Sequence, residues 1–482
     1  MKTKDTKKHT FAFGVVIMLF FMWGFVTVLN DILIPHLKGV FQLTHFQSML
    51  VQTAFFGAFF IISIIYFAIS AISGDPIAKI GYKNGIIIGL VIGGVGCALF
   101  YPAAEFKSYP FFLGALFVLA SGVTILQIAA NPYVAILGNP DTAASRLNLS
   151  QGFNSLGTTL APIIGANLIF QGTFEGADSV KLPYLGLAAA WWALAVIIWR
   201  IQLPSFASHR IEKRAIAIRF PHLNLGMIAI FVYVGAEVAI GSIIIQYLGL
   251  ENVAGMTEKT AGKYLAFYWG GAMIGRFMGA ISLSKMKNFN KQLGLMWIVS
   301  MAAFFIIYLI AGINIVKGEI VTVIELDEMW PFIGFMSLNF VAFVLGKGSS
   351  GRTLAIFATI VIGLLIASIR SEGTWAMWTI ISIGLFNSIM WSNIFTLAID
   401  GLGKYTSQGS SLLVMMILGG AIVPPLQGKL ADIEGIGIQN SFAIVIICYA
   451  FLVFYGLKGS QIGKDKLPNL EGDEEPIVRS GH

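Results

Sequence analysis

The sequence predicts an all-α membrane protein, on the strength of its composition, the length of its apolar runs and an internal repeat. Of the 482 residues, 57% are hydrophobic and only 11% are charged, whereas a soluble domain has about 25% charged residues. Apolar runs of about 20 residues, long enough to cross the hydrocarbon core as a helix, recur along the whole chain. We therefore expect about fourteen transmembrane helices.

The expected helices follow one another through short polar connections. The first follows the basic segment MKTKDTKKHT and is too long for the apolar part of a signal peptide, so we expect an uncleaved helix. The predicted spans are 11–37, 48–73, 84–102, 110–137, 147–171, 183–203, 222–249, 260–283, 292–313, 330–346, 353–370, 374–400, 407–428 and 438–457.

Basic residues alternate between the connections. With a cytoplasmic N-terminus, the outside loops are poorer in basic residues and include acidic ones, whereas the inside loops hold Lys79, Lys83, Arg146, Arg210, Lys213, Arg214, Arg219, Lys285, Lys287, Lys291, Lys347, Arg352 and Lys404. This is the bias that orients membrane proteins, and it predicts that both termini are cytoplasmic. It also accounts for the net charge of +7 without a nucleic-acid partner.

The two halves of the chain resemble each other. Phe20 and Gly24 correspond to Phe231 and Gly235, and Asn131, Gly157 and Pro162 correspond to Asn393, Gly419 and Pro424. Two copies of a six-helix unit place a site between the halves near the membrane centre. The expected parts are a first bundle (1–203), a cytoplasmic linker (204–221), a second bundle (222–458) with an extra two-helix hairpin at about 288–346, and a polar tail (459–482).

Asp31 is an acid within the first apolar span. A carboxylate in the membrane is costly unless it faces a wet cavity, has a partner or takes up a proton, and such acids are usually functional. Burial disfavours the charged form, so Asp31 could accept a proton. The alternative is an acid that only bonds a neighbouring helix or faces the outer mouth.

Two pairs of amides share helix faces. Gln127 and Asn131 are four residues apart, and Gln151 and Asn154 are three apart. Amides both donate and accept hydrogen bonds, which suits the hydroxyl groups of a sugar. The alternative is polar contact between helices, and Asn131, which precedes Pro132, is as well suited to that role as to ligand binding.

Glu237 is a second acid within an apolar span. It could bind a ligand hydroxyl or a cation, or pair with Arg276. Arg276 itself fits a gate or packing role better than ligand binding.

Several classes of protein lack support in the sequence. Cys97 and Cys448 lie far apart in apolar spans and are expected to be inert thiols. The sequence contains no HExxH, CxxC or GxxxxGK[ST] motif, so we expect no metal, no cofactor and no enzyme or ATP-driven pump.

Five segments carry a family resemblance: WGFVTVLNDILIP (23–35), LQIAANPYVAILG (126–138), SRLNLSQGFNSLGTTLAPIIG (145–165), FVYVGAEVAIGS (231–242) and FNSIMWSNIFTLAIDGLGKYTSQGSSLLVMMILGGAIVP (386–424). They resemble the fucose permease and glucose/galactose transporter branch of the major facilitator superfamily. The resemblance implies the major facilitator fold and an alternating-access sugar permease, usually coupled to a cation. Gln127 stands where fucose permease has a glutamate, which favours a substrate other than fucose, and GDPIAKIGYKNG (74–85) keeps only part of the superfamily loop motif.

The resemblance also implies residue roles. Asp31 matches the proton-coupling aspartate, with Asn30 beside it, and Gln127, Gln151 and Asn154 match sugar-binding positions. Trp391 stands where fucose permease has a substrate-lining tyrosine, and an aromatic ring suits one face of a sugar. Asn387 and Asn393 flank it without sharing a helix face, so at most one should line the cavity.

These observations lead to a functional hypothesis. We expect a bacterial inner-membrane protein, functional as a monomer, that imports a glucose- or galactose-like hexose with a proton. Fucose, an N-acetylhexosamine, sodium coupling and a sugar uniporter remain alternatives, as does a membrane receptor or assembly protein.

Overall fold

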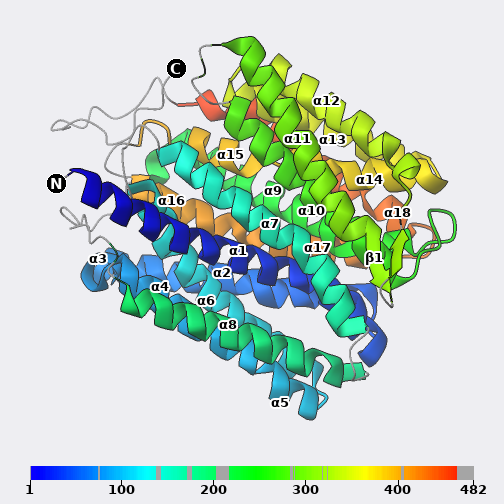
Figure 1. Cartoon of the computed structure of the whole chain (residues 1–482), viewed down its shortest axis with the longest axis horizontal. Helices are drawn as coiled ribbons and strands as arrows, with labels where there is room; N and C mark the ends of the chain where they lie inside the picture. The colour runs from blue at the N-terminus through cyan, green and yellow to red at the C-terminus, as the bar shows by residue number, and fades with distance from the viewer. Residues whose placement is uncertain are drawn as a thin grey trace.

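The computed structural model of the chain is a bundle of long, nearly parallel and antiparallel helices (Figure 1). It describes residues 2–73, 76–136, 143–170, 176–201, 203, 217–282, 286, 288–316, 319–322, 324–402 and 406–463. Most of the predicted linker (204–216) and most of the predicted tail (464–482) lie outside these ranges.

The helices of the first half are α1 (Lys2–Phe41), α2 (His45–Ser73), α3 (Pro76–Ile80), α4 (Tyr82–Ala98), α5 (Phe100–Glu105), α6 (Tyr109–Ile136), α7 (Ala143–Phe170) and α8 (Lys181–Arg200), with a 3₁₀ turn, η2 (Gly176–Val180), before α8. The second half contains α9 (Pro221–Leu248), α10 (Glu258–Ser282), α11 (Phe289–Gly312), α12 (Trp330–Gly346), α13 (Ser350–Arg370), α14 (Gly373–Asn387), α15 (Met390–Ile399), α16 (Thr406–Met415), α17 (Gly419–Ala431), α18 (Gly437–Ser441) and α19 (Ala443–Leu457). The remaining 3₁₀ turns are η3 (Ala217–Arg219), η4 (Leu326–Met329), η6 (Met416–Leu418) and η7 (Gly459–Gln461).

Twelve helical segments of the described chain are long and apolar enough to cross a membrane. Helices α7 and α10 are not among the twelve, although they have 28 and 25 residues. Both have more polar sequences, SRLNLSQGFNS in α7 and EKTAGKY in α10, and they pack closely on each other. A total of fourteen spans therefore stays a prediction.

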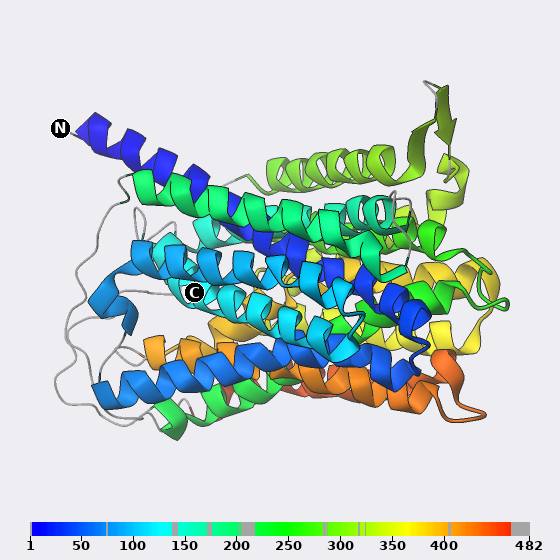
Figure 2. The same cartoon turned by 90° about the horizontal axis from the view of Figure 1, so that it is seen from below.

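The segment predicted as an extra hairpin contains α11 and α12. Between them lie two short strands, β1 (Ile313–Val316) and β2 (Glu319–Thr322), which pair antiparallel with Ile313 opposite Thr322. The prediction of an all-α chain did not include these strands. Figure 2 shows α11 on the outside of the bundle and the strands projecting beyond it.

The glycines matched between the halves make equivalent contacts. Gly157 of α7 packs against the backbone of Phe21 and Phe25 in α1. Gly419, at the start of α17, packs against the backbone of Phe231 and Gly235 in α9. A side chain at either glycine would collide with a backbone carbonyl of the neighbouring helix, which explains why small residues are needed where these helices cross.

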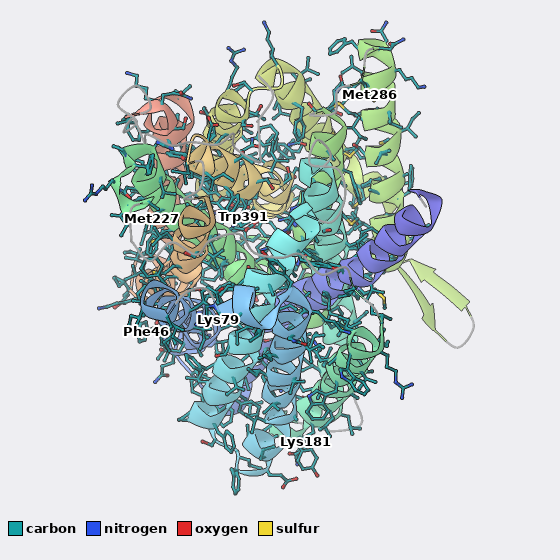
Figure 3. All side chains as sticks on the ribbon, turned by 90° about the vertical axis from the view of Figure 1, so that its left-hand side faces the viewer. Phe46, Lys79, Lys181, Met227, Met286 and Trp391 are labelled. Atoms are coloured by element: carbon teal, nitrogen blue, oxygen red, sulfur yellow. The ribbon has the colours of Figure 1, made fainter. Side chains whose placement is uncertain are left out.

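The halves meet mainly through two helix pairs, α2 with α17 and α7 with α10. We call the end of the molecule at which α1 ends and α2 begins the distal end; it lies opposite the N-terminus (Figure 1). Figure 3 views the helices nearly end-on from the other side.

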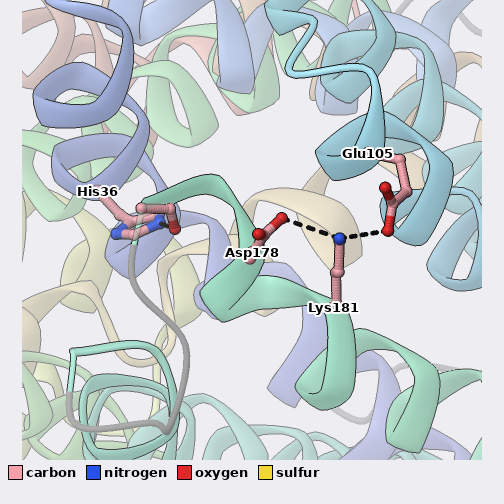
Figure 4. A network of polar contacts seen from close by, with 5 residues as sticks. His36, Glu105, Asp178 and Lys181 are labelled. Carbon is pink, nitrogen blue, oxygen red and sulfur yellow. Dashed lines mark hydrogen bonds and ion pairs between the residues drawn. The ribbon is translucent and has the colours of Figure 1, made fainter.

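Polar contacts fasten the distal end of the first half (Figure 4). Lys181, at the start of α8, forms ion pairs with Glu105 at 2.5 Å and Asp178 at 2.9 Å. His36 Nε2 of α1 lies 3.1 Å from both the Gly176 carbonyl oxygen and Ser179 Oγ. These contacts hold α1, η2 and α8 together at this end.

Candidate transport site

Asp31 lies in α1 about 15 Å from the distal end of that helix, at 1.5 Å per residue. Its side chain is buried, with 3% of the residue exposed. Gln52 Nε2 donates a hydrogen bond to Oδ1 at 3.0 Å, and Trp269 Nε1 donates to Oδ2 at 3.1 Å. Ser242 Oγ lies 3.4 Å from Oδ1 and accepts a 2.8 Å hydrogen bond from Gln52.

The partners of Asp31 come from both halves of the protein. Gln52 is in α2 of the first half, whereas Ser242 is in α9 and Trp269 is in α10 of the second half. An ionised carboxylate only accepts hydrogen bonds, whereas a protonated one also donates, and hydrogen bonds to the ionised form are stronger. A proton on Asp31 therefore changes the strength of a contact that joins the two halves.

Glu237 belongs to a second polar cluster, inside the second half. Tyr233, one helical turn earlier in α9, donates through its hydroxyl to Glu237 Oε1 at 2.7 Å. Tyr268 OH donates to the Glu237 carbonyl oxygen at 3.0 Å. Glu237 is half-buried. Its carboxylate accepts a hydrogen bond from Tyr233 and can accept further hydrogen bonds.

Asn387 completes this cluster. Its Nδ2 donates to Tyr268 OH at 3.1 Å, and its Oδ1 accepts from Tyr449 OH at 2.7 Å. Because the residue is fully buried and both ends of its amide are occupied, Asn387 positions tyrosines rather than presenting a free amide.

A break in the helical backbone lies beside the cluster. The sequence predicts one span at 374–400, but the structure has two helices, α14 and α15, separated at Ser388 and Ile389. The Ser388 carbonyl oxygen accepts from Arg276 Nε at 3.1 Å. The Asn387 carbonyl oxygen lies 2.9 Å from Tyr233 OH, whose single proton is shared between this oxygen and Glu237 Oε1. Side chains thus satisfy the carbonyls freed by the break, as membrane burial requires.

Arg276 of α10 also contacts the first half. Its Nη1 donates to Ser155 Oγ of α7, and Gly152 of α7 packs on the ring of the adjacent Phe277. Within the described chain, Arg276 forms no ion pair with Glu237, and the ion pairs present there are those of Lys181. Arg276 therefore joins the halves through neutral groups.

The predicted amides occupy different environments. Asn154 Nδ2 donates to the Phe20 carbonyl oxygen of α1 at 2.9 Å, an interhelical contact. Gln127 is buried and Gln151 is half-buried. Among the described residues, neither amide atom of the fully buried Asn30 has a hydrogen-bond partner, and neither does the buried Oδ1 of Asn131. Unpaired buried amides are unusual and are available to a ligand or to water.

Trp391 of α15, labelled in Figure 3, is half-buried. Its ring stacks on that of Phe395, with ring centroids 5.0 Å apart and planes at 16°. Asn393 is buried and donates to the Ser350 carbonyl oxygen at 3.2 Å. The aromatic pair thus offers a flat apolar surface on the helix that follows the break.

The structure adds residues that the sequence analysis missed. Gln52, Ser242 and Trp269 surround Asp31, and Tyr233, Tyr268 and Tyr449 surround Glu237 and Asn387. Tyr233 could have been found, because it precedes Glu237 by one helical turn, and Gln52 is conspicuous as an amide in an apolar helix. Nothing in the local sequence marks Trp269, because only the packing of the two halves brings its indole N–H to Asp31.

Comparison with known proteins places these features in a family. No sequence profile of a known family matches the chain. The glucose/galactose transporter of Brucella abortus biovar 1 (strain 9-941) is 45% identical over 469 residues, covering 95% of this chain and 97% of that protein. The L-fucose-proton symporter of Escherichia coli (strain K12) is 30% identical over 486 residues, covering 95% of each chain.

A solved structure shows the same fold. The crystal structure of the transporter FucP in the outward conformation superposes with a TM-score of 0.62 at 29% identity, covering 93% of this chain and 98% of that chain. The chain therefore belongs to the major facilitator superfamily of membrane transporters, in the branch that includes the bacterial glucose/galactose transporters and the L-fucose-proton symporter.

Proposed function

We propose that this protein imports a hexose together with a proton across the bacterial inner membrane by alternating access, with both termini in the cytoplasm. The observation that carries the proposal is the buried carboxylate of Asp31, which bonds to both halves of the protein. Alternating access moves the halves relative to each other around a central site. A proton on Asp31 would bias that motion.

The polar groups between and beside the halves supply candidates for sugar binding. Glu237 has spare acceptor capacity, and Gln127, Gln151, Asn30 and Asn131 offer amides for sugar hydroxyls. Trp391 would cover one face of the ring. Asn154 would contribute while holding α1 against α7, and Asn387 would act through Tyr268 and Tyr449. Arg276 would serve as a gate contact.

The relatives support the choice of hexose and proton. The more similar relative is named a glucose/galactose transporter, and the more distant one an L-fucose-proton symporter. We therefore place glucose or galactose before fucose or an N-acetylhexosamine. The protein would act as a monomeric carrier rather than as an enzyme, with the lipid bilayer and the co-transported cation as its other partners.

The test is uptake of labelled hexoses into proteoliposomes, with and without an inward proton gradient. The wild type should accumulate sugar only with the gradient. Asp31→Asn should lose accumulation but retain sugar exchange, which also shows that the variant is folded. Asp327→Asn, the same change at an exposed acid beside α12, should behave as wild type.

Other results of the uptake experiment would favour one of the alternative functions. Accumulation driven only by a sodium gradient would replace the proton by sodium, and equilibration without accumulation would indicate a uniporter. Absence of hexose transport under every condition would contradict the sugar assignment and favour a receptor or assembly role.

A further inference from the structure

The distal end of the protein contains a further polar contact between the halves. Asp432 follows the last residue of α17, in the second half. Its Oδ1 accepts a hydrogen bond from the backbone N–H of His45 at 3.1 Å, and its Oδ2 accepts one from the N–H of Phe46 at 3.0 Å. These two residues begin α2, in the first half.

This contact completes the N-terminal cap of α2. The first N–H groups of a helix have no partner within the helix. In α2, Gln47 N–H donates to Thr44 Oγ1 at 3.1 Å, and Ser48 N–H donates to the Thr44 carbonyl oxygen at 3.0 Å. Asp432 satisfies the remaining two. The cap of one half is thus built partly from a residue of the other half.

Asp432 is poorly placed for its own helix. A negative charge at the C-terminal end of a helix opposes the helix dipole, whereas the same charge at an N-terminal end is favourable. No lysine or arginine forms an ion pair with Asp432 in the described part of the chain. Its favourable interaction is therefore with α2.

The backbones of the two helices also approach closely here. A Cβ added to Gly428, one turn before Asp432, would lie 3.0 Å from the His45 carbonyl oxygen and 3.1 Å from Met49 Cγ. Farther along the same interface, Thr53 Oγ1 donates to the Ala421 carbonyl oxygen at 2.8 Å. Gly428 therefore lets α17 lie close enough for the Asp432 carboxylate to reach both N–H groups.

We propose that Asp432 is the latch of the distal gate: it holds the distal ends of α2 and α17 together in the closed state and releases α2 when the halves separate there. Separation leaves the His45 and Phe46 N–H groups and the carboxylate to water. The latch rests on alternating access, but it requires neither a particular sugar nor proton binding by Asp31.

The test measures separation of the distal ends directly. Phe106→Cys in the first half and Glu251→Cys in the second are both exposed at this end. The two native cysteines, both buried, are replaced by alanine. Spin labels at the new cysteines report the distance distribution by electron paramagnetic resonance in lipid nanodiscs, without substrate.

Asp432→Ala should increase the ratio of open to closed molecules by about 2- to 30-fold, the range expected for loss of a helix cap. Asp432→Asn keeps one acceptor and should give a smaller increase. Gly428→Ala should also open the end, because it separates the helices without removing the charge. Glu434→Ala removes a nearby exposed acid and should change nothing.

The result is independent of transport. Unchanged distances in Asp432→Ala, or an equal change in Glu434→Ala, would overturn the latch even if the protein carries hexose and protons. An open-to-closed ratio that is highest in Asp432→Ala, intermediate in Asp432→Asn and lowest in the wild type would support the latch even if no sugar were transported. Size-exclusion profiles and thermal melts of each variant verify that it is folded.

Discussion

The hydrogen bond from Trp269 to Asp31 should control how the halves separate. Trp269→Phe keeps an aromatic ring in α10 but removes the Nε1–H that donates to Asp31 Oδ2. The other donor from the second half, Ser242 Oγ, is 3.4 Å from the carboxylate, which is long for an O–H donor. Trp269 therefore provides most of the polar contact between Asp31 and the second half.

The change in the open-to-closed ratio depends on whether the Asp31 carboxylate is ionised. A hydrogen bond to a charged group contributes about 1.5–3 kcal/mol, and water replaces part of it when the distal end opens. A net loss of about 1 kcal/mol should raise the open-to-closed ratio by roughly fivefold when Asp31 is ionised. In an Asp31→Asn background the charge is absent, so the effect should largely disappear.

The assay is the same distal distance measurement, made on the four proteins of a double-mutant cycle. Trp378→Phe is the matched control, because Trp378 is fully buried but its Nε1 has no hydrogen-bond partner within the described part of the chain. An equal effect of Trp269→Phe in the wild-type and Asp31→Asn backgrounds would refute the reasoning. Such a result would assign the effect to lost packing of the indole ring.

Two further predictions concern packing and the second polar cluster. Gly157→Ala should lower the free energy of unfolding by about 1–3 kcal/mol, because its methyl group would collide with the α1 backbone. Gly186→Ala, with open space around it, should not destabilise the protein, and thermal melts in detergent would show whether the two changes differ. Tyr233→Phe removes the donor to the Glu237 carboxylate and should weaken sugar binding about tenfold, since a hydrogen bond to a charged group contributes about 1.5–3 kcal/mol. Tyr184→Phe, at a buried hydroxyl that has no hydrogen-bond partner among the described residues, should leave binding unchanged. Equal affinities of the two variants in a direct binding titration would contradict the role of Tyr233.

The helices and the repeat were largely predictable from the sequence because both depend on local patterns. Membrane-length apolar runs locate most helices, and the correspondence of Gly157 with Gly419 reflects equivalent crossings, of α1 with α7 and α9 with α17. The break at Ser388 was not predictable in the same way. It depends on donors from Tyr233 and Arg276, which lie on other helices.

The site was only partly predictable for a related reason. Asp31 is conspicuous because a charge in an apolar helix has a cost that the sequence alone reveals. Its partners Ser242 and Trp269 are more than 200 residues away and are selected by how the halves pack. Asp432 lay outside the predicted spans, and only its contact with the start of α2 distinguishes it from other exposed acids.

The central claim, that hexose and proton move together through Asp31, is tested most directly by recording external pH as sugar enters lightly buffered proteoliposomes without an imposed gradient. The account predicts that glucose or galactose makes the medium more alkaline as protons follow the sugar inward. Asp31→Asn should show no pH change while still exchanging sugar. Sugar entry into wild-type proteoliposomes with no change in external pH would contradict the account.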